Sequence, residues 1–242
     1  MINKKCIIAI LLTAVLLMPA SAQISRTYSR SANVAEATDS SISLWPATGA
    51  AYMGLRHVIS FGNFKTSRVH ASTNETVVMS VSLNRGAKFR FKQLLGDMAI
   101  KVKARQDLNI DDIAKFVKVI GNHNNLDKGL DYTATIDDPV EGVWTMAMNT
   151  SFSDEDFDCG FIYHENTDMQ YLIRGRNYSN SLDVMLMRAN FYYNIYDGDT
   201  LVASVNSDGK GWAWIDTTLA PERQIVLAAA ISSMLMLKWN VN

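Results

Sequence analysis

Apolar and polar residues alternate with a period of two over much of the chain from about residue 54 onward. Within residues 87–106, Phe89 and Phe91 alternate with basic residues, and the alternation resumes after a turn near Gly96 and Asp97. Because successive side chains of a strand point to opposite faces, each strand has one apolar and one cationic face. The pattern predicts a hairpin in an antiparallel sheet with one face on the core and the other in water.

Further short strands are expected on both sides of this hairpin, separated by turns rich in Gly, Asp and Asn such as Asp197-Gly198-Asp199. Such close spacing is typical of an antiparallel barrel or sandwich. The expected strands are Thr76–Leu83, Val143–Met148, Phe161–His164, Gln170–Ile173, Asp183–Met187, Phe191–Tyr196, Leu201–Val205 and Trp212–Ile215.

One amphipathic helix is expected between Asn109, which can cap its start, and Gly121, which can end it. An apolar stripe at helical spacing predicts that the helix packs on the sheet. The stripe consists of Ile113, Phe116, Val117 and Ile120.

A second helix is expected from Pro221, and its 13 residues from Ile225 to Leu237 carry no charge. We expect it to reach water only near Ser232 and Ser233. A helix that is apolar all round is buried in protein or lies in a membrane, and this one is shorter than the roughly 20 residues that span a bilayer. A sheet surrounds a helix on all sides only by closing around it. The predicted fold class is therefore mainly β with helices, an antiparallel β-barrel wrapped around a hydrophobic C-terminal helix.

The run from Phe191 to Ala203, the strand Trp212-Ala213-Trp214-Ile215 and the apolar helix together resemble the closing part of tubby-like and LURP-one-related barrel domains. In those domains an antiparallel barrel wraps a central hydrophobic helix. The segment Phe61-Gly62-Asn63-Phe64 adds a resemblance to exported uncharacterised proteins of Bacteroidota. The resemblance implies an architecture and no particular activity, because the basic residues with which tubby-like domains bind phosphoinositides are not assignable to positions here.

The first 22 residues are typical of a cleavable secretory signal peptide, with Lys4 and Lys5 before an apolar run and small residues at Ala20-Ser21-Ala22. Cleavage predicts a periplasmic or secreted bacterial protein without a transmembrane segment. Residues 23–43, rich in Ser, Ala and Thr, predict a flexible leader. Residues 44–242 are expected to form a single β-rich domain around the C-terminal helix.

Loss of residues 1–22 removes two basic residues and no acidic one, which leaves 21 basic against 24 acidic residues and a formal charge of −3. This balance argues against nucleic acid as a partner. One cysteine, Cys159, is left, so an internal disulfide is excluded, which suits a bacterial envelope.

The polar side of the predicted hairpin is nevertheless cationic over its whole length. Two interpretations stay open for it: a solvated face, or a surface that binds an acidic lipid, glycan or envelope protein. Its residues are Lys88, Arg90, Lys92, Lys101, Lys103 and Arg105.

One acidic pattern has the spacing of positions 1, 3, 5 and 12 of an EF-hand calcium loop. It consists of Asp154, Asp156, Asp158 and Glu165. Cys159 occupies the position where that loop needs Gly, and the flanking residues predict strands instead of helices. We therefore expect a solvated acidic loop, with a calcium site of another kind as the alternative.

Cys159 and His164 lie close enough in sequence to suggest a thiol nucleophile, but their odd spacing along one strand predicts opposite faces. His57, His70 and His123 show no metal-ligand spacing. The chain contains no Gly-x-Ser-x-Gly elbow, His-Glu-x-x-His helix, phosphate-binding glycine loop or Cys-x-x-Cys pair. No catalytic, metal or cofactor-binding residue is therefore assigned, and no cofactor is expected.

Two further groups have ordinary structural interpretations. Asp137, Asp138 and Glu141 surround Pro139 and predict a turn. The tryptophans are expected to pack in the core or on the sheet, with stacking on sugars as the alternative; they are Trp144, Trp212 and Trp214. The sequence thus favours an exported non-enzymatic binding or structural interaction domain. The alternative is a hydrolase of envelope or dietary glycans that uses paired carboxylates.

Overall fold

The computed structural model describes residues 44–48, 58–72, 88–106, 130–150, 153–178, 190–207 and 211–237. Several predicted segments lie outside the described residues. They are the signal peptide and leader, the strands Thr76–Leu83 and Asp183–Met187, and the helix at 109–121. All described elements belong to one compact unit, Ser43–Asn242.

The described residues form short strands near the start of this unit, longer strands after them, and a helix at the end. The first strands are β1 (Trp45–Pro46), β2 (Ser60–Phe61), β3 (Phe64–Thr66), β4 (His70–Ser72), β5 (Lys88–Leu95) and β6 (Met98–Gln106). They are followed by β7 (Tyr132–Asp138), β8 (Gly142–Met148), β9 (Ser153–His164), β10 (Gln170–Tyr178), β11 (Asn190–Asp197), β12 (Thr200–Asn206), β13 (Trp212–Ile215) and the helix α6 (Pro221–Leu237).

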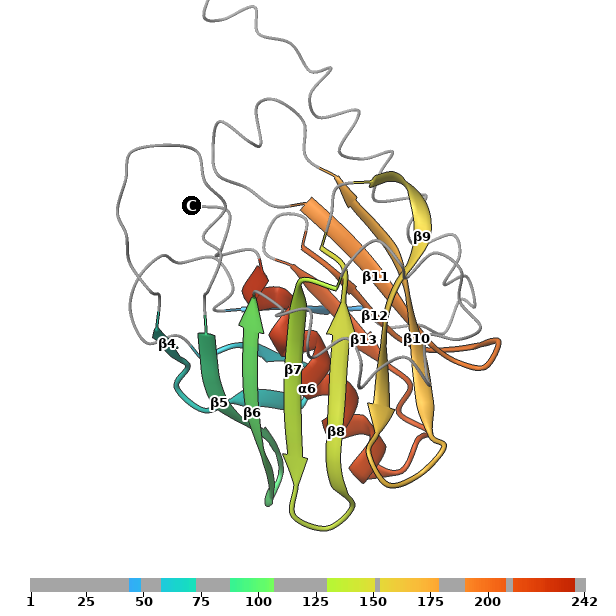
Figure 1. Cartoon of the computed structure of the whole chain (residues 1–242). Coiled ribbons are helices and arrows are strands. Elements are labelled where there is room, and N and C mark those ends of the chain that lie inside the picture. Colours follow the sequence, from blue (N-terminus) through green and yellow to red (C-terminus); the bar gives the residue numbers. More distant parts are fainter. Residues whose placement is uncertain are drawn as a thin grey trace, which may run out of the picture. The chain divides into compact units, whose positions relative to one another are not determined.

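The strands form one antiparallel sheet that is nearly closed into a barrel (Figure 1). From β5 to β13 each strand pairs with its neighbour in the chain, β3 and β2 continue beyond β5, and β1 continues beyond β13. The two ends of this order meet at a single bridge, where Thr48 and Ser60 exchange backbone hydrogen bonds of 2.9 and 3.1 Å. The predicted antiparallel barrel is confirmed.

The helix α6 fills the barrel. All 12 residues from Ile225 to Met236 have no exposed surface, and α6 contacts strands on both sides of the barrel, β5, β6 and β7 as well as β12 and β13. Burial of its seven large apolar side chains contributes on the order of 10–20 kcal/mol as a gross upper limit. The predicted central helix is therefore confirmed.

The prediction that the helix reaches water near Ser232 and Ser233 was wrong, because both residues are fully buried. The Ser232 hydroxyl donates to the Gln93 side-chain oxygen on β5 at 2.7 Å, and the Ser233 hydroxyl donates to the Ala229 carbonyl at 2.8 Å. The Tyr132 hydroxyl on β7 donates to the Ser233 carbonyl at 2.8 Å. Buried polar groups need such partners, and these bonds fix the position of the helix relative to the wall.

The predicted hairpin at 87–106 is confirmed as β5 and β6, with Gly96 and Asp97 in the turn. The turn expected around Pro139 is shorter than predicted, because Asp137 and Asp138 end strand β7 and the turn covers 139–141. Strand β7 itself was not predicted. It places Tyr132, Ala134 and Ile136 in the core.

Removal of the helix is expected to prevent folding. Deletion of residues 225–242 leaves the inner faces of the strands without a packing partner, so the shortened chain should be insoluble, as measured by the soluble fraction after expression. The milder change Leu227→Ala is expected to lower the free energy of unfolding by about 2–5 kcal/mol in denaturant titrations. Asp199→Ala, at an exposed turn, serves as the control. A soluble truncated chain that unfolds cooperatively would contradict the central role of the helix.

Candidate functional site

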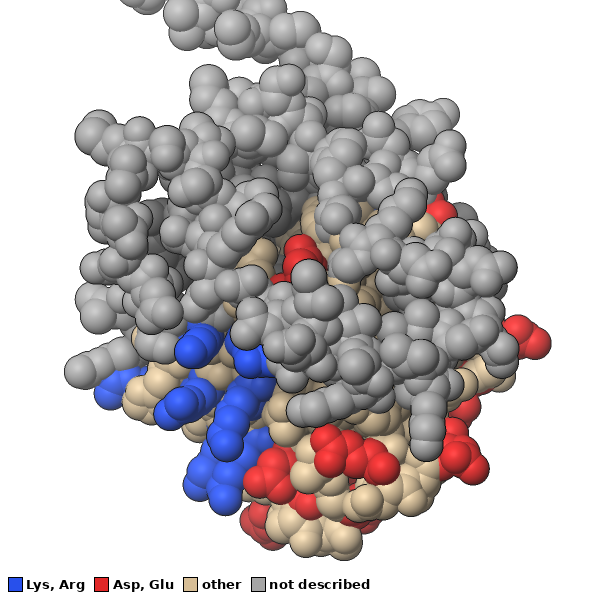
Figure 2. Space-filling model, in the orientation of Figure 1, with Lys and Arg blue, Asp and Glu red and all other residues tan. Residues whose placement is uncertain are grey.

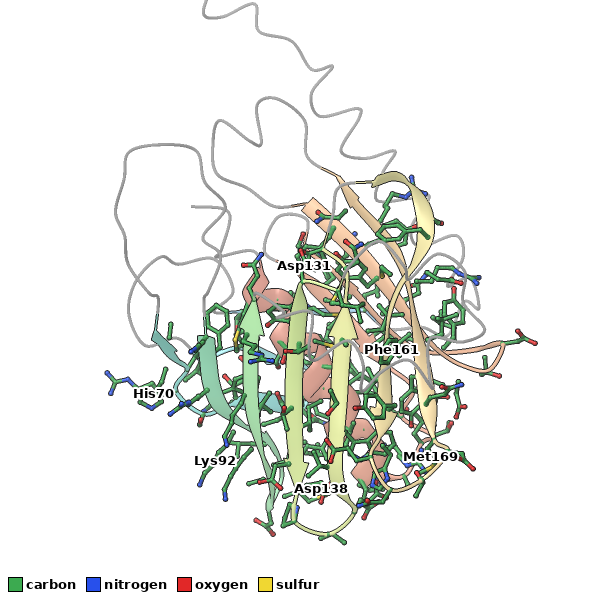
Figure 3. All side chains as sticks on the ribbon, in the orientation of Figure 1. His70, Lys92, Asp131, Asp138, Phe161 and Met169 are labelled. Atoms are coloured by element: carbon green, nitrogen blue, oxygen red, sulfur yellow. The ribbon has the colours of Figure 1, made fainter. Side chains whose placement is uncertain are left out.

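The outer side of β5 and β6 carries six basic residues in three directly facing pairs, which we call the cationic face. The facing pairs are Lys88 and Arg105, Arg90 and Lys103, and Lys92 and Lys101. Figure 2 shows these basic side chains gathered on one part of the surface, with acidic side chains on the adjoining part. Figure 3 shows Lys92 and the neighbouring His70 projecting away from the barrel.

The spacing within the cationic face follows from sheet geometry. Directly opposite residues have Cβ atoms about 4.5–5.5 Å apart, and successive positions on one face of a strand are about 7 Å apart. Three positions on each strand therefore give two parallel rows of charge about 14 Å long. The two rows are separated by a single spacing between neighbouring strands.

Five of the six cations, all except Arg105, are exposed. None of these five has an ion-pair partner in the part of the chain that the structure describes. Arg105 is half-buried, and its Nε donates to the Thr133 hydroxyl at 3.4 Å. Within the described residues, these five charges therefore take part in no direct ion pair.

The surroundings of the cationic face differ on its two sides. On β4, exposed His70 faces Arg90. On β7, Asp137 faces Lys101, whereas the uncharged Thr135 faces Lys103. On β3, exposed Lys65 faces Leu94 and so lies on the same outer side, beyond Lys92. Cations therefore extend to a third strand on that side, and an acidic residue lies at one end of the β7 side.

The inner sides of β5 and β6 hold the cationic face in place. Phe89, Phe91, Ile100 and Val102 are each at most 5 % exposed and belong to the core that surrounds α6. Like charges that face each other directly across a sheet are destabilising. The apolar anchoring of both strands allows the three pairs to persist despite this cost.

The acidic segment is a strand and not the predicted loop, because Ser153–His164 is β9 throughout. Asp158 and Asp156 accept from Arg174 and Arg176 of β10, with Oδ1–Nε distances of 2.7 Å in both pairs. The side chain of Asp154 lies outside the described residues.

Glu165 follows the end of β9 and accepts from the Thr145 hydroxyl at 3.2 Å. The described residues hold no group of three or more side chains able to bind a metal ion. Carboxylates at every second position are typical of one face of a strand, and this is the signal that the loop interpretation missed.

The prediction that Cys159 and His164 lie on opposite faces of their strand was wrong, because a register shift interrupts β9 beside Cys159. Both side chains are buried, at 0 % and 4 % exposure. The Cys159 thiol donates to the Ile173 carbonyl at 3.4 Å, while His164 Nε2 donates to the Glu141 carbonyl at 2.7 Å. Five residues of strand separate them by about 16 Å, so they form no catalytic pair.

Trp144 lies in the core with no exposed surface, as expected. Its ring stacks on Tyr171 with centroids 5.8 Å apart and meets His164 edge-on at 4.9 Å. The Arg223 guanidinium, from the first turn of α6, lies 5.4 Å from the Trp144 centroid and donates to the Tyr171 hydroxyl at 2.9 Å. Glu141 Oε2 lies 3.8 Å from Arg223 Nε. This cluster attaches the start of the helix to the barrel.

The other candidate residues do not converge with the cationic face into a common site. Trp212 and Trp214 are half-buried on β13, where they face Asn206 and Ser204. His57 and His123 lie outside the described residues. His70 is the histidine that the structure places beside the cationic face.

Comparison with family models, curated proteins and solved structures gives no match to this chain. In the described residues, no helix combines the length and the apolar composition needed to cross a bilayer. The cationic face is therefore assigned from its own geometry.

Cys159 is expected to resist alkylation while the protein is folded. Burial raises the pKa of its thiol well above the usual value, and the neighbouring Asp158 carboxylate adds to the rise. Since the thiolate is the reactive form, iodoacetamide at pH 7.5 should modify Cys159 only after unfolding in urea, as followed by mass spectrometry. Modification of the folded protein at the rate of a free thiol would show that this strand opens.

Stability is expected to fall above about pH 10. Burial raises the pKa of the Tyr132 hydroxyl above its ordinary value. The folded state therefore keeps a proton that the unfolded state loses near pH 10, so unfolding becomes easier as pH rises past that value. Denaturant titrations between pH 8 and 11 should show this decline, and Tyr132→Phe should show a smaller one. Equal declines in both proteins would assign the effect to other groups.

Proposed function

We propose that this chain is an exported, non-enzymatic interaction domain that binds an anionic partner through the cationic face. The observation that carries the proposal is the set of three facing like-charge pairs, in which Arg90 and Lys103 form the middle pair. Each pair opposes folding through mutual repulsion. An anion bound between the two rows removes this repulsion and gains attraction from both sides.

The arrangement of charged residues by sign favours a binding surface over a merely solvated one as the interpretation of the cationic face. A surface that serves solubility alone gains from interspersed signs, as on β9 and β10, where Asp158 pairs with Arg174. On β5 and β6 the cations face one another in three pairs, and Lys101 also faces Asp137 on β7. A surface of one sign attracts oppositely charged partners and raises their local concentration.

Several of the described carboxylates have structural partners, although Asp138 Oδ2 and Glu141 Oε2 are buried without a hydrogen-bond partner. Asp138 Oδ1 accepts from the backbone nitrogens of Val140 and Glu141, at 2.8 and 3.2 Å. Asp131 accepts from the Thr150 backbone nitrogen and hydroxyl, at 2.7 and 2.5 Å. These contacts stabilise turns and strand ends, and they offer no specific support for the hydrolase alternative.

The proposed location is the periplasm or the exterior of a bacterium, on the basis of the signal-peptide pattern in residues 1–22. The barrel around an apolar helix agrees in architecture with a relationship to tubby-like domains, which we also retain as a proposal. Neither of these two proposals identifies the anion.

The proposed function predicts that the chain from residue 23 onward binds a cation exchanger at pH 7 and low salt despite its formal charge of −3. The variant Lys92→Glu/Lys103→Glu should pass through the column. It should also be at least as stable as the parent, because Lys101 and Arg90 then face a carboxylate. Retention volumes and thermal melting curves measure the two effects.

Arg174→Glu/Arg176→Glu is the matched control, since it changes the net charge by the same amount on β10 and should still bind. Equal retention of both variants would assign binding to net charge and not to the cationic face. Failure of the parent protein to bind at low salt would remove the basis of the proposed function.

A further inference from the structure

We infer that the anionic partner of the cationic face is a second copy of this chain, which contributes the acidic surface beside its own cationic face; this inference rests on the proposed function. The evidence is a row of residues that face one another across neighbouring strands, which we call the cross-strand row. Its members are Lys92 of β5, Lys101 of β6, Asp137 of β7, Val143 of β8 and Glu165, which follows β9 and donates its backbone N–H to the Val143 carbonyl at 3.0 Å.

The sign of charge changes once along the cross-strand row. Two exposed cations, Lys92 and Lys101, lie on the β5 and β6 side, and two exposed carboxylates, Asp137 and Glu165, lie on the side of β7 to β9. Although Lys101 and Asp137 face each other, they form no ion pair within the described residues. Both charges are therefore open to a partner. Figure 2 shows basic and acidic side chains adjoining on one surface.

A row of this kind is complementary to itself. A two-fold axis parallel to the strands, along the boundary between β6 and β7, brings Lys101 of each copy against Asp137 of the other. One strand further from the axis, about 4.8 Å away, Lys92 of each copy meets Val143 of the other. The aliphatic stem of Lys92 packs on that valine while its charge reaches towards Glu165 of the same copy. Because the barrel wall is convex, these residues beside the axis lie closest to the second copy.

The change of sign selects this occupant over a partner of uniform charge. An anionic surface wide enough to span the row meets Asp137 and Glu165 as well as the two lysines, and a cationic surface is repelled by the lysines. A second copy presents the opposite charges in reverse order and is attracted along the whole row. Two-fold interfaces, in which the same surface serves both partners, are also the commonest arrangement in homo-oligomers.

The position of the cross-strand row makes it accessible. It lies near the short turns at 96–97 and 139–141. The connections outside the described residues that adjoin β5 and β6, residues 73–87 and 107–129, join these strands at their opposite end. Val140, with 83 % of its surface exposed, lies in the turn that follows β7 and adds apolar surface beside the row.

Association is expected to be weak and sensitive to salt, because its attraction comes from ion pairs at the surface. Sedimentation velocity of the chain from residue 23 onward, over a series of protein concentrations, measures it. In 50 mM salt the weight-average sedimentation coefficient should rise with concentration from that of a monomer towards that of a dimer. The dissociation constant should increase about tenfold in 500 mM salt.

Exchange of charge between two variants locates the contact. Asp137→Lys places cations at both central positions, and Lys101→Asp places carboxylates at both, so each variant alone should associate about tenfold more weakly than the parent. An equimolar mixture of the two variants should regain dimers, because each lysine then meets an aspartate across the axis. Cooperative melting of each variant confirms that it folds.

The matched controls are Asp199→Lys and Arg174→Asp, which reverse the same charges in the turn after β11 and on β10. Alone and mixed, these variants should associate like the parent, within about twofold. Equal losses in the control and test variants, or no dimer in the mixture of the two test variants, would overturn the inference.

The cation exchanger separates this inference from the proposed function. A parent protein that is retained on the column but stays monomeric at every concentration would overturn the second copy as partner and leave a domain that binds another anion. Absence of retention together with absence of association would overturn both.

Discussion

The burial of α6 is the constraint on which the rest of the structure depends. A helix with apolar residues in every direction gains stability only if protein surrounds it, and the sheet provides this by curving until Thr48 meets Ser60. The polar groups of the helix also hold it in place, because Ser232 bonds to Gln93 of β5 and Arg223 bonds to Tyr171 of β10. Since the helix occupies the barrel interior, the surface that is open to a partner is the outside of the barrel.

On that outer surface, charged residues are arranged differently on β9 and β10 and on β5 and β6. Arg174 and Arg176 lie opposite carboxylates of β9 and lie over the rings of Tyr196 and Tyr192, 5.7 and 5.1 Å from the centroids. Their charges are thereby largely compensated within the molecule. The cations of β5 and β6 face each other instead, and like charges in such facing positions repel one another.

Much of this arrangement is readable from the sequence because it depends on local periodicity. The alternation around Phe89 and the uncharged run before Leu237 predicted the hairpin, its cationic side and the central helix. What the sequence did not show depends on contacts between distant residues. A register shift beside Cys159 reversed the expected side of His164, and Gln93 made a buried position acceptable for Ser232. The direct facing of the cations required the strand register, which the two-residue turn at Gly96 and Asp97 sets.

The place of α6 after every described strand has a consequence for the order of folding. During synthesis the strands emerge before the element that covers their inner faces, so residues such as Phe91 and Trp144 lack the helix as a packing partner until Pro221–Leu237 has been made. Contacts between the helix and β3 or β5 also close very long loops, which slows folding. We therefore expect the barrel to form as one late event, after α6 has been made, and we expect the apolar strands to be open to aggregation until then.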